Sequence, residues 1–158
     1  MTETKILAEP GKQQVTLTRV FDAPRELVYR VYTDPALLPG WWGPDKYTTK
    51  VERMEVRHGG VWRFVQYDGD DGSEHAFRGV YHDATAPERL VQTFEYEGAP
   101  GHVLLETTIF EDVGGRTRVT NTSVFQSLAD RDAMLAEGMT DGAVRSYERL
   151  AELVAQRR

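Results

Sequence analysis

The chain has 158 residues, of which 40% are hydrophobic and 28% charged, with no cysteine and a net charge of -6 at pH 7. This size and composition predict one soluble domain with a single core and exclude disulfides, thiolate catalysis and thiolate metal sites. No apolar run approaches the roughly 20 residues of a membrane span, and the interspersed charges argue against nucleic acid as a partner.

The first 46 residues predict an arm, a strand and two short helices. Residues 1–14 are polar with a Pro10-Gly11 turn and predict a flexible N-terminal arm, without the basic start and apolar stretch of a secretory signal. The location expected is therefore cytoplasmic. Residues 15–21 are β-branched and aromatic, which predicts a strand. A helix follows from Asp22 or Ala23 at the cap with Pro24 in its first turn, and a second short helix spans residues 34–40.

From residue 47 to residue 125 the sequence predicts an antiparallel meander. Turn signals recur between segments of strand length, at residues 58–60, 68–72, 86–87, 98–101 and 114–115. Apolar residues alternate within several strands, so that Trp62 lies on the same face as Phe64, and Thr108 on the same face as Phe110. The register of residues 47–56 is left open by the pattern.

The C-terminal region predicts a long helix. Ser127 to Asp130 resembles a capping box, and an apolar stripe continues to about residue 156. Asp141 and Arg145 have the i,i+4 spacing of an ion pair on this helix. Gly138 and Gly142 allow two interpretations of equal weight. They leave room between the helix and the sheet, or they break the helix between residues 138 and 142. The element order predicts an α+β domain, a curved antiparallel sheet wrapped around this helix.

Several short motifs together resemble the START-like (SRPBCC, helix-grip) superfamily, in the branch related to the activator of heat-shock protein 90 ATPase. They cover nearly the whole chain, and one departs from the pattern because His58 stands where the family often has proline. The resemblance implies a single ligand-binding domain over residues 15–158 with a cavity between sheet and long helix. The motifs are residues 19–24 (RVFDAP), 34–35, 41–44 (WWGP), 57–60, 62–64, 77–79, 87–90, 93–94 and 138–142.

A large aromatic set is the leading candidate for the lining of this cavity. Aromatic side chains supply rigid apolar contact area to a ligand, although each also packs well in an ordinary core. Methionines would make the wall adaptable. The predicted ligand-binding residues are Trp41, Trp42, Met54, Trp62, Phe64, His75, Phe77, Tyr81, Phe94, Phe110, Met139 and Gly142.

The polar residues give no convincing catalytic or metal site. Of the four histidines only His75 alternates with the inward-facing Phe77, so it is the one candidate anchor or general base, and no pair has a compact metal-ligand spacing. The charged strand residues Arg19, Arg53 and Glu106 are each expected to face solvent. No metal, no cofactor and no catalytic residue are therefore expected.

Three functions follow for this sequence. The leading hypothesis is a non-enzymatic binding protein for a small hydrophobic or aromatic molecule. The second is an enzyme of the polyketide cyclase kind, with His75 or Tyr81 moving a proton in the same cavity. The third is a co-chaperone or protein-interaction module, which needs an exposed apolar patch on the outer sheet face and has no specific residue in its support. The expected assembly is a monomer or a homodimer, with no membrane partner.

Overall fold

A computed structural model describes residues 3–158, so the first two residues of the expected arm lie outside the described part. The described residues form an eight-stranded antiparallel sheet, with one α-helix and a 3-10 helix before the third strand and two α-helices at the C-terminus, as the α+β prediction requires. The bounds are β1 Lys5–Leu7, β2 Gln14–Phe21, α1 Arg25–Thr33, the 3-10 helix Leu38–Gly40, β3 Tyr47–Met54, β4 Val61–Asp68, β5 Glu74–Thr85, β6 Arg89–Tyr96, β7 Val103–Val113, β8 Arg116–Phe125, α2 Leu128–Ala136 and α3 Met139–Arg157.

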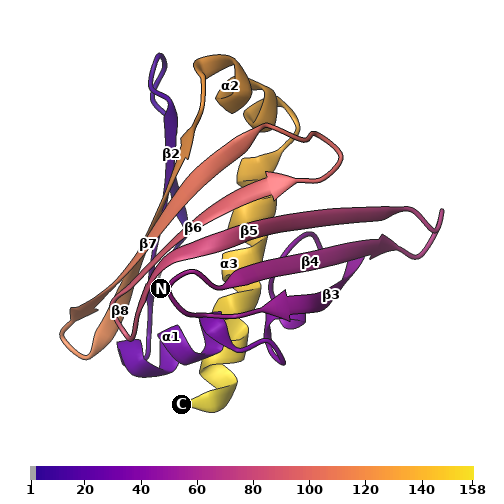
Figure 1. Ribbon diagram of the computed structural model, residues 1–158. Coiled ribbons are helices and arrows are strands. Elements are labelled where there is room, and N and C mark those ends of the chain that lie inside the picture. The colour runs from indigo at the N-terminus through magenta and orange to yellow at the C-terminus, as the bar shows by residue number, and fades with distance from the viewer. Residues whose placement is uncertain (1–2) are drawn as a thin grey trace.

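The sheet is a meander that β2 extends at one side. Strands β3 to β8 follow one another, β2 pairs with β8, and β1 pairs with β2 at the edge. All five predicted turns lie between consecutive strands of this meander. The sheet curves around α3, which crosses its concave face (Figure 1). The chain passes from β2 to β3 through α1 and the 3-10 helix. These two elements contact α3 and lie at one end of the space between the sheet and α3.

The two ends of the chain differ from the sequence-based expectation. The expected loose arm contains β1, whose Lys5 pairs with Thr18 of β2. At the other end the single long helix is divided, because Gly138 adopts φ +87° between α2 and α3. The interpretation of a helix break is therefore confirmed, with the break at Gly138. Ser127 caps α2 as predicted, since its hydroxyl accepts a hydrogen bond from the backbone N–H of Asp130 at 3.1 Å.

One surface ion pair differs from the pair expected from the sequence. Arg145 of α3 bonds Asp45 in the loop before β3 at 2.9 Å, and not Asp141 on its own helix. On the outer sheet face Arg78 pairs with Glu95 at 3.1 Å, as expected of water-facing positions. That face also exposes the cross-strand neighbours Leu105 and Val124, which are 42% and 41% accessible.

Candidate functional site

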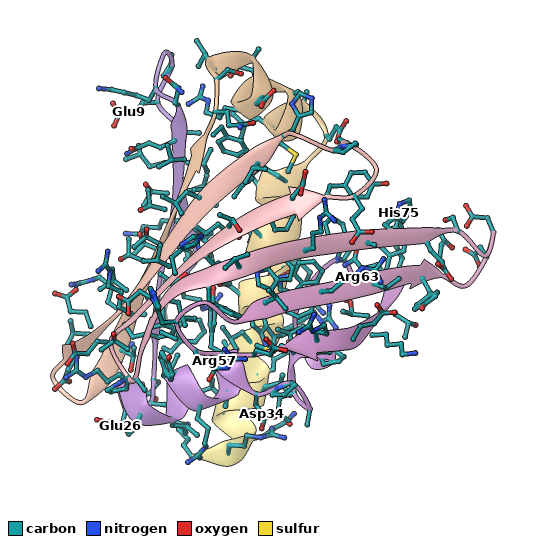
Figure 2. The ribbon with its side chains drawn as sticks, viewed as in Figure 1. Glu9, Glu26, Asp34, Arg57, Arg63 and His75 are labelled. Atoms are coloured by element: carbon teal, nitrogen blue, oxygen red, sulfur yellow. The ribbon has the colours of Figure 1, made fainter. Side chains whose placement is uncertain are left out.

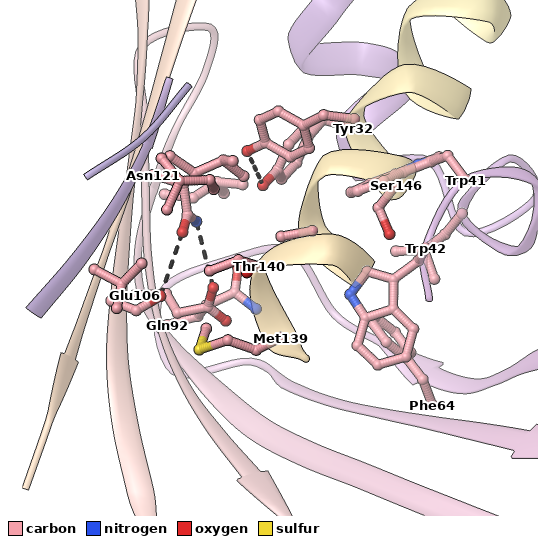
Figure 3. A pocket seen from close by; sticks show the side chains of 18 of the residues that line it. Tyr32, Trp41, Trp42, Phe64, Gln92, Glu106, Asn121, Met139, Thr140 and Ser146 are labelled. Atoms are coloured by element: carbon pink, nitrogen blue, oxygen red, sulfur yellow. Dashed lines mark hydrogen bonds between the residues drawn. The ribbon is translucent and has the colours of Figure 1, made fainter. Parts of the chain in front are cut away.

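The site is a cavity of about 150 Å³ between the concave sheet face and α3. Its walls come from the sheet, from the first half of α3, and from α1 and the following loop. Figure 3 shows Glu106, Gln92 and Asn121 on the sheet side, facing Trp42 and Phe64, with Met139 and Thr140 of α3 between them. The cavity is thus polar along one wall and aromatic along the opposite one.

The sheet wall is one transverse row of side chains. Val15 pairs with Ser123, Ser123 with Glu106, Glu106 with Gln92, and Gln92 with Tyr81, from β2 across β8, β7 and β6 to β5. Cross-strand partners point to the same side of a sheet. All five line the cavity. Strand pairing therefore brings together three polar side chains, Ser123, Glu106 and Gln92, which form the polar row between Val15 and Tyr81.

A neighbouring buried row holds the acidic group of this wall in place. Asn121 donates from Nδ2 to the Thr108 hydroxyl at 2.9 Å and to the Glu106 carboxylate at 3.3 Å. Ser123 in turn donates its hydroxyl hydrogen bond to Asn121 Oδ1 at 3.4 Å. Asn121, Thr108 and Ser123 are all buried. The amide of Asn121 therefore fixes the carboxyl against the sheet with a donor that carries no charge.

Glu106 is the one acidic residue of the described cavity lining, and no lysine, arginine or histidine lines it. Burial raises the pKa of Glu106 to about 7, and the hydrogen bond from Asn121 offsets only part of this effect. The carboxyl therefore changes charge near neutral pH. A titrating group in a cavity with no counter-charge is an arrangement that functional sites commonly have.

Tyrosines complete the wall between sheet and helices. The hydroxyls of Tyr32 on α1 and Tyr147 on α3 hydrogen-bond each other at 2.9 Å. Burial raises the pKa of Tyr32 to about 12 and that of Tyr147 well above its usual value, and the charge of Glu106 adds to both. Both phenols therefore stay neutral at physiological pH and remain donors and acceptors.

The helix wall has small and flexible side chains. Met139, Thr140, Ala143 and Ser146 of α3 line the cavity. Ser146 is further tied to the loop before β3, because its hydroxyl accepts a hydrogen bond from the backbone N–H of Gly43 at 3.1 Å. Small residues at this helix surface keep space open above the polar row.

Half of the predicted ligand-binding residues line the cavity. These are Trp41, Trp42, Met54, Phe64, Tyr81 and Met139. Trp41 is 3% exposed, and its indole N–H has no hydrogen-bond partner among the described residues.

The other predicted residues lie outside the lining, for three different reasons. Trp62, Phe77 and Phe94 pack on one another, with ring centroids 5.9 Å apart for Trp62 and Phe94 and 5.4 Å for Phe77 and Phe94. Phe110 packs edge-on against Tyr29 at 5.1 Å and Tyr32 at 5.2 Å. These rings pack on one another or on neighbouring rings and do not border the cavity. Gly142 has no atom within 4 Å of its added Cβ position and does not line the cavity either.

His75 lies away from the cavity. It is near the end of the β4–β5 hairpin, away from α3 (Figure 2), where its Nδ1 is 3.0 Å from the Tyr96 hydroxyl. It shares a strand face with Phe77, but that face extends beyond the cavity along β5. His75 therefore has no contact with the polar row that would support a role as general base there.

The expectation that Glu106 faces solvent is wrong. Strand alternation contained the signal, because residues 106, 108 and 110 share one face and the sequence already places Thr108 and Phe110 inward. Arg19 is also not fully solvated, since its Nε is buried and its Nη1 donates to the Thr4 hydroxyl at 2.9 Å. Arg53 is exposed as expected and pairs with Glu55.

Residues 3–158 contain neither a metal-binding cluster nor a membrane-spanning helix. Within this range no group of three or more histidine, aspartate or glutamate side chains could hold a metal ion. None of its helices combines the length and apolar character needed to cross a bilayer.

Solved structures from several bacteria share this fold. A solution structure of a protein from Arthrobacter aurescens is 25% identical with a TM-score of 0.88, covering 96% of this chain and 91% of that one. A crystal structure from Rhodobacter sphaeroides is 26% identical with a TM-score of 0.87, covering 99% and 100%. The AHSA1 protein of Silicibacter pomeroyi is 21% identical with a TM-score of 0.76, covering 92% and 99%.

The sequence itself was compared with curated proteins and with models of protein families. No curated protein matches it. Residues 22–155 match the family model described as Activator of Hsp90 ATPase homolog 1-like protein. The matched segment includes α1, α2, most of α3 and the strands β3 to β8, whereas β1 and β2 precede it. The chain therefore belongs to the family of Activator of Hsp90 ATPase homolog 1-like proteins, within the START-like helix-grip superfamily.

Proposed function

We propose that this protein binds one small ligand with an apolar ring and a polar group in the cavity between its sheet and α3. The observation that carries the proposal is the division of the cavity into an aromatic wall and a polar row centred on Glu106. Ligand sites are commonly apolar clefts with a few placed polar groups that orient the bound molecule.

The cavity volume limits the size of the ligand. An engineered protein cavity of about 150 Å³ binds benzene, and this cavity has a volume of about 150 Å³. A single ring with a short substituent therefore suits it. Burying about 150 Å² of apolar ligand surface contributes about 4 kcal/mol before ordering costs, so a ligand of this size also needs polar contacts for tight binding.

A cavity-filling variant tests the location of the site. Ala143→Leu adds three carbons to the helix wall of the cavity, whereas Ala133→Leu makes the same change at an exposed position of α2. Single-ring compounds are first screened by ligand-observed NMR against the wild-type protein. For compounds that bind, Ala143→Leu is expected to weaken affinity at least about tenfold, which corresponds to about 1.4 kcal/mol, and Ala133→Leu to leave it unchanged.

Two results would contradict the proposal. One is a screen in which no compound binds, combined with native mass spectrometry that detects no co-purified molecule. The other is binding that Ala143→Leu leaves unaffected, which would place the ligand elsewhere. Thermal unfolding of both variants, compared with wild type, checks that the leucine side chains leave the fold intact.

Proton transfer to a bound ligand is the second candidate function. It is favoured by Glu106, whose pKa of about 7 suits a general acid or base at neutral pH. In this function Glu106 takes the role that the sequence suggested for His75. Product formation from a bound ligand by wild type, and its loss in Glu106→Gln with binding retained, would separate turnover from simple binding.

A further inference from the structure

The described lining of the cavity contains an acidic side chain but no basic one. Glu106 brings one carboxyl group, and the described lining contains no basic side chain to neutralise it. Its cross-strand neighbours are the amide of Gln92 and the hydroxyl of Ser123, which are both neutral. Among the residues that the structure describes, Asn121 alone donates a hydrogen bond to this carboxylate, at 3.3 Å. A half-buried carboxylate with a single long hydrogen bond leaves acceptor capacity for a further donor.

The aromatic side chains of the cavity favour a positive charge on the ligand group that donates to Glu106. Trp41, Tyr81 and Tyr147 line the cavity together with Glu106. Aromatic faces carry negative electrostatic potential and attract cations, most strongly where water is excluded. An anionic ligand would meet both this potential and the carboxylate, with no basic residue to oppose them. A neutral donor would leave the carboxylate without a counter-charge.

We propose that the ligand of this cavity is a small amine with one apolar ring, bound as its ammonium ion with the charged group on Glu106. This inference rests on the proposed binding function and names its ligand class. The ring packs against Trp42 and Phe64, and the ammonium donates to the Glu106 carboxylate. Gln92 and Ser123 offer further oxygen acceptors beside Glu106, which suit the three N–H donors of an ammonium group.

Binding of a cation is coupled to the protonation of Glu106. The groups that face it are Asn121 and Ser123 on β8, Gln92 on β6, Tyr81 on β5, Tyr32 on α1 and Tyr147 on α3. All three tyrosines have raised pKa values and stay neutral. Because burial raises the pKa of Glu106 to about 7, the carboxyl is mainly protonated at pH 6 and mainly ionised at pH 8. Affinity for an ammonium ion should therefore rise about tenfold between these values.

Three probes of matched size test the charge preference. Benzylamine is a cation across pH 6 to 8, benzyl alcohol is neutral, and benzoate is an anion. Affinities are measured by NMR titration of the full chain, with cavity resonances reporting the site. The expected result is that wild type binds benzylamine at least tenfold more tightly than benzyl alcohol at pH 8 and binds benzoate most weakly.

The matched variants are Glu106→Gln and Glu111→Gln. Glu111 is an exposed residue of the same strand, paired with Arg118 at 3.0 Å. Glu106→Gln is expected to remove both the preference for benzylamine and its pH dependence, whereas Glu111→Gln keeps both. If Glu106→Gln does not fold, the pH dependence in wild type and the proton release measured by calorimetry in two buffers still decide the question.

Failure of this inference differs from failure of the proposed function. Benzyl alcohol or benzoate binding in the cavity as tightly as benzylamine would overturn the cation preference and leave the cavity as a binding site. The same holds if the preference for benzylamine survives in Glu106→Gln. If none of the three probes shifts a cavity resonance at any pH, the cation preference is overturned together with the binding of single-ring ligands.

Discussion

The concave face of the sheet has two regions with opposite packing. In one region, Trp62, Phe77 and Phe94 of β4, β5 and β6 pack on one another and do not line the cavity. Toward β7 and β8, the polar row with Glu106 faces the small side chains of α3, and a cavity remains. The comparison teaches that large aromatic residues mainly fill the inside of this fold. Open space remains where the non-aromatic polar side chains of the sheet lie opposite Thr140, Ala143 and Ser146 of the helix.

The largest expected effect is in the filled region. Trp62 is 1% exposed, and its indole N–H donates to the carbonyl oxygen of Thr93 at 3.2 Å. Trp62→Ala should lower the free energy of unfolding by about 3 to 5 kcal/mol, because it leaves a large void and removes this hydrogen bond. Urea denaturation measures the change. Leu105→Ala, at an exposed position of the outer face, should cost less than about 0.5 kcal/mol. Equal losses in the two variants would contradict the assignment of the core.

A smaller, pH-dependent effect is expected in the cavity region. The pKa of Glu106 is about 7 in the folded chain against 4.5 for an ordinary glutamate. Between these values the folded state binds more protons, so stability falls as pH rises. From pH 5.5 to pH 8 Glu106 should lower the free energy of unfolding by up to about 2 kcal/mol.

Removal of the charge tests this contribution. Glu106→Gln should be more stable than wild type at pH 8 and closer to it at pH 5.5, as measured by urea denaturation at both pH values. Glu111→Gln should follow the wild-type dependence, because Glu111 is exposed. If the free energies of unfolding of wild type and Glu106→Gln differ by the same amount at pH 5.5 and pH 8, Glu106 does not titrate in this window.

The smallest effects concern the start of α3, which sets the helix wall of the cavity. Gly142 is helical with no atom within 4 Å of an added Cβ, so Gly142→Ala should stabilise the protein by about 0.5 to 1 kcal/mol. Gly138 has φ +87°, so Gly138→Ala should destabilise it by about 1 to 2 kcal/mol. Thermal unfolding compares the pair. The same sign of change in both variants would contradict the break between α2 and α3 at Gly138.

Strand alternation and turn residues were sufficient for much of this fold and for part of the site. The five glycine- or proline-containing turns and the inward faces of Trp62, Phe64 and Phe110 follow from local patterns that the backbone obeys wherever the strand lies. The same alternation places Glu106 inward with Thr108. A charged strand residue is nevertheless ordinarily solvated, and no local pattern shows that a cavity will accept it.

The sequence by itself determined the helix-grip architecture, since period-two and helical patterns, caps and turns are properties of neighbouring residues. Only the tertiary structure decided which inward side chains border empty space. Trp62 and Phe94 are distant in the chain and close the space by stacking, whereas Glu106 meets Gln92 and Ser123 through strand register and faces α3. Register and helix position arise from the packing of the whole chain, so the location of the cavity and the environment of its carboxyl could not be read from local sequence.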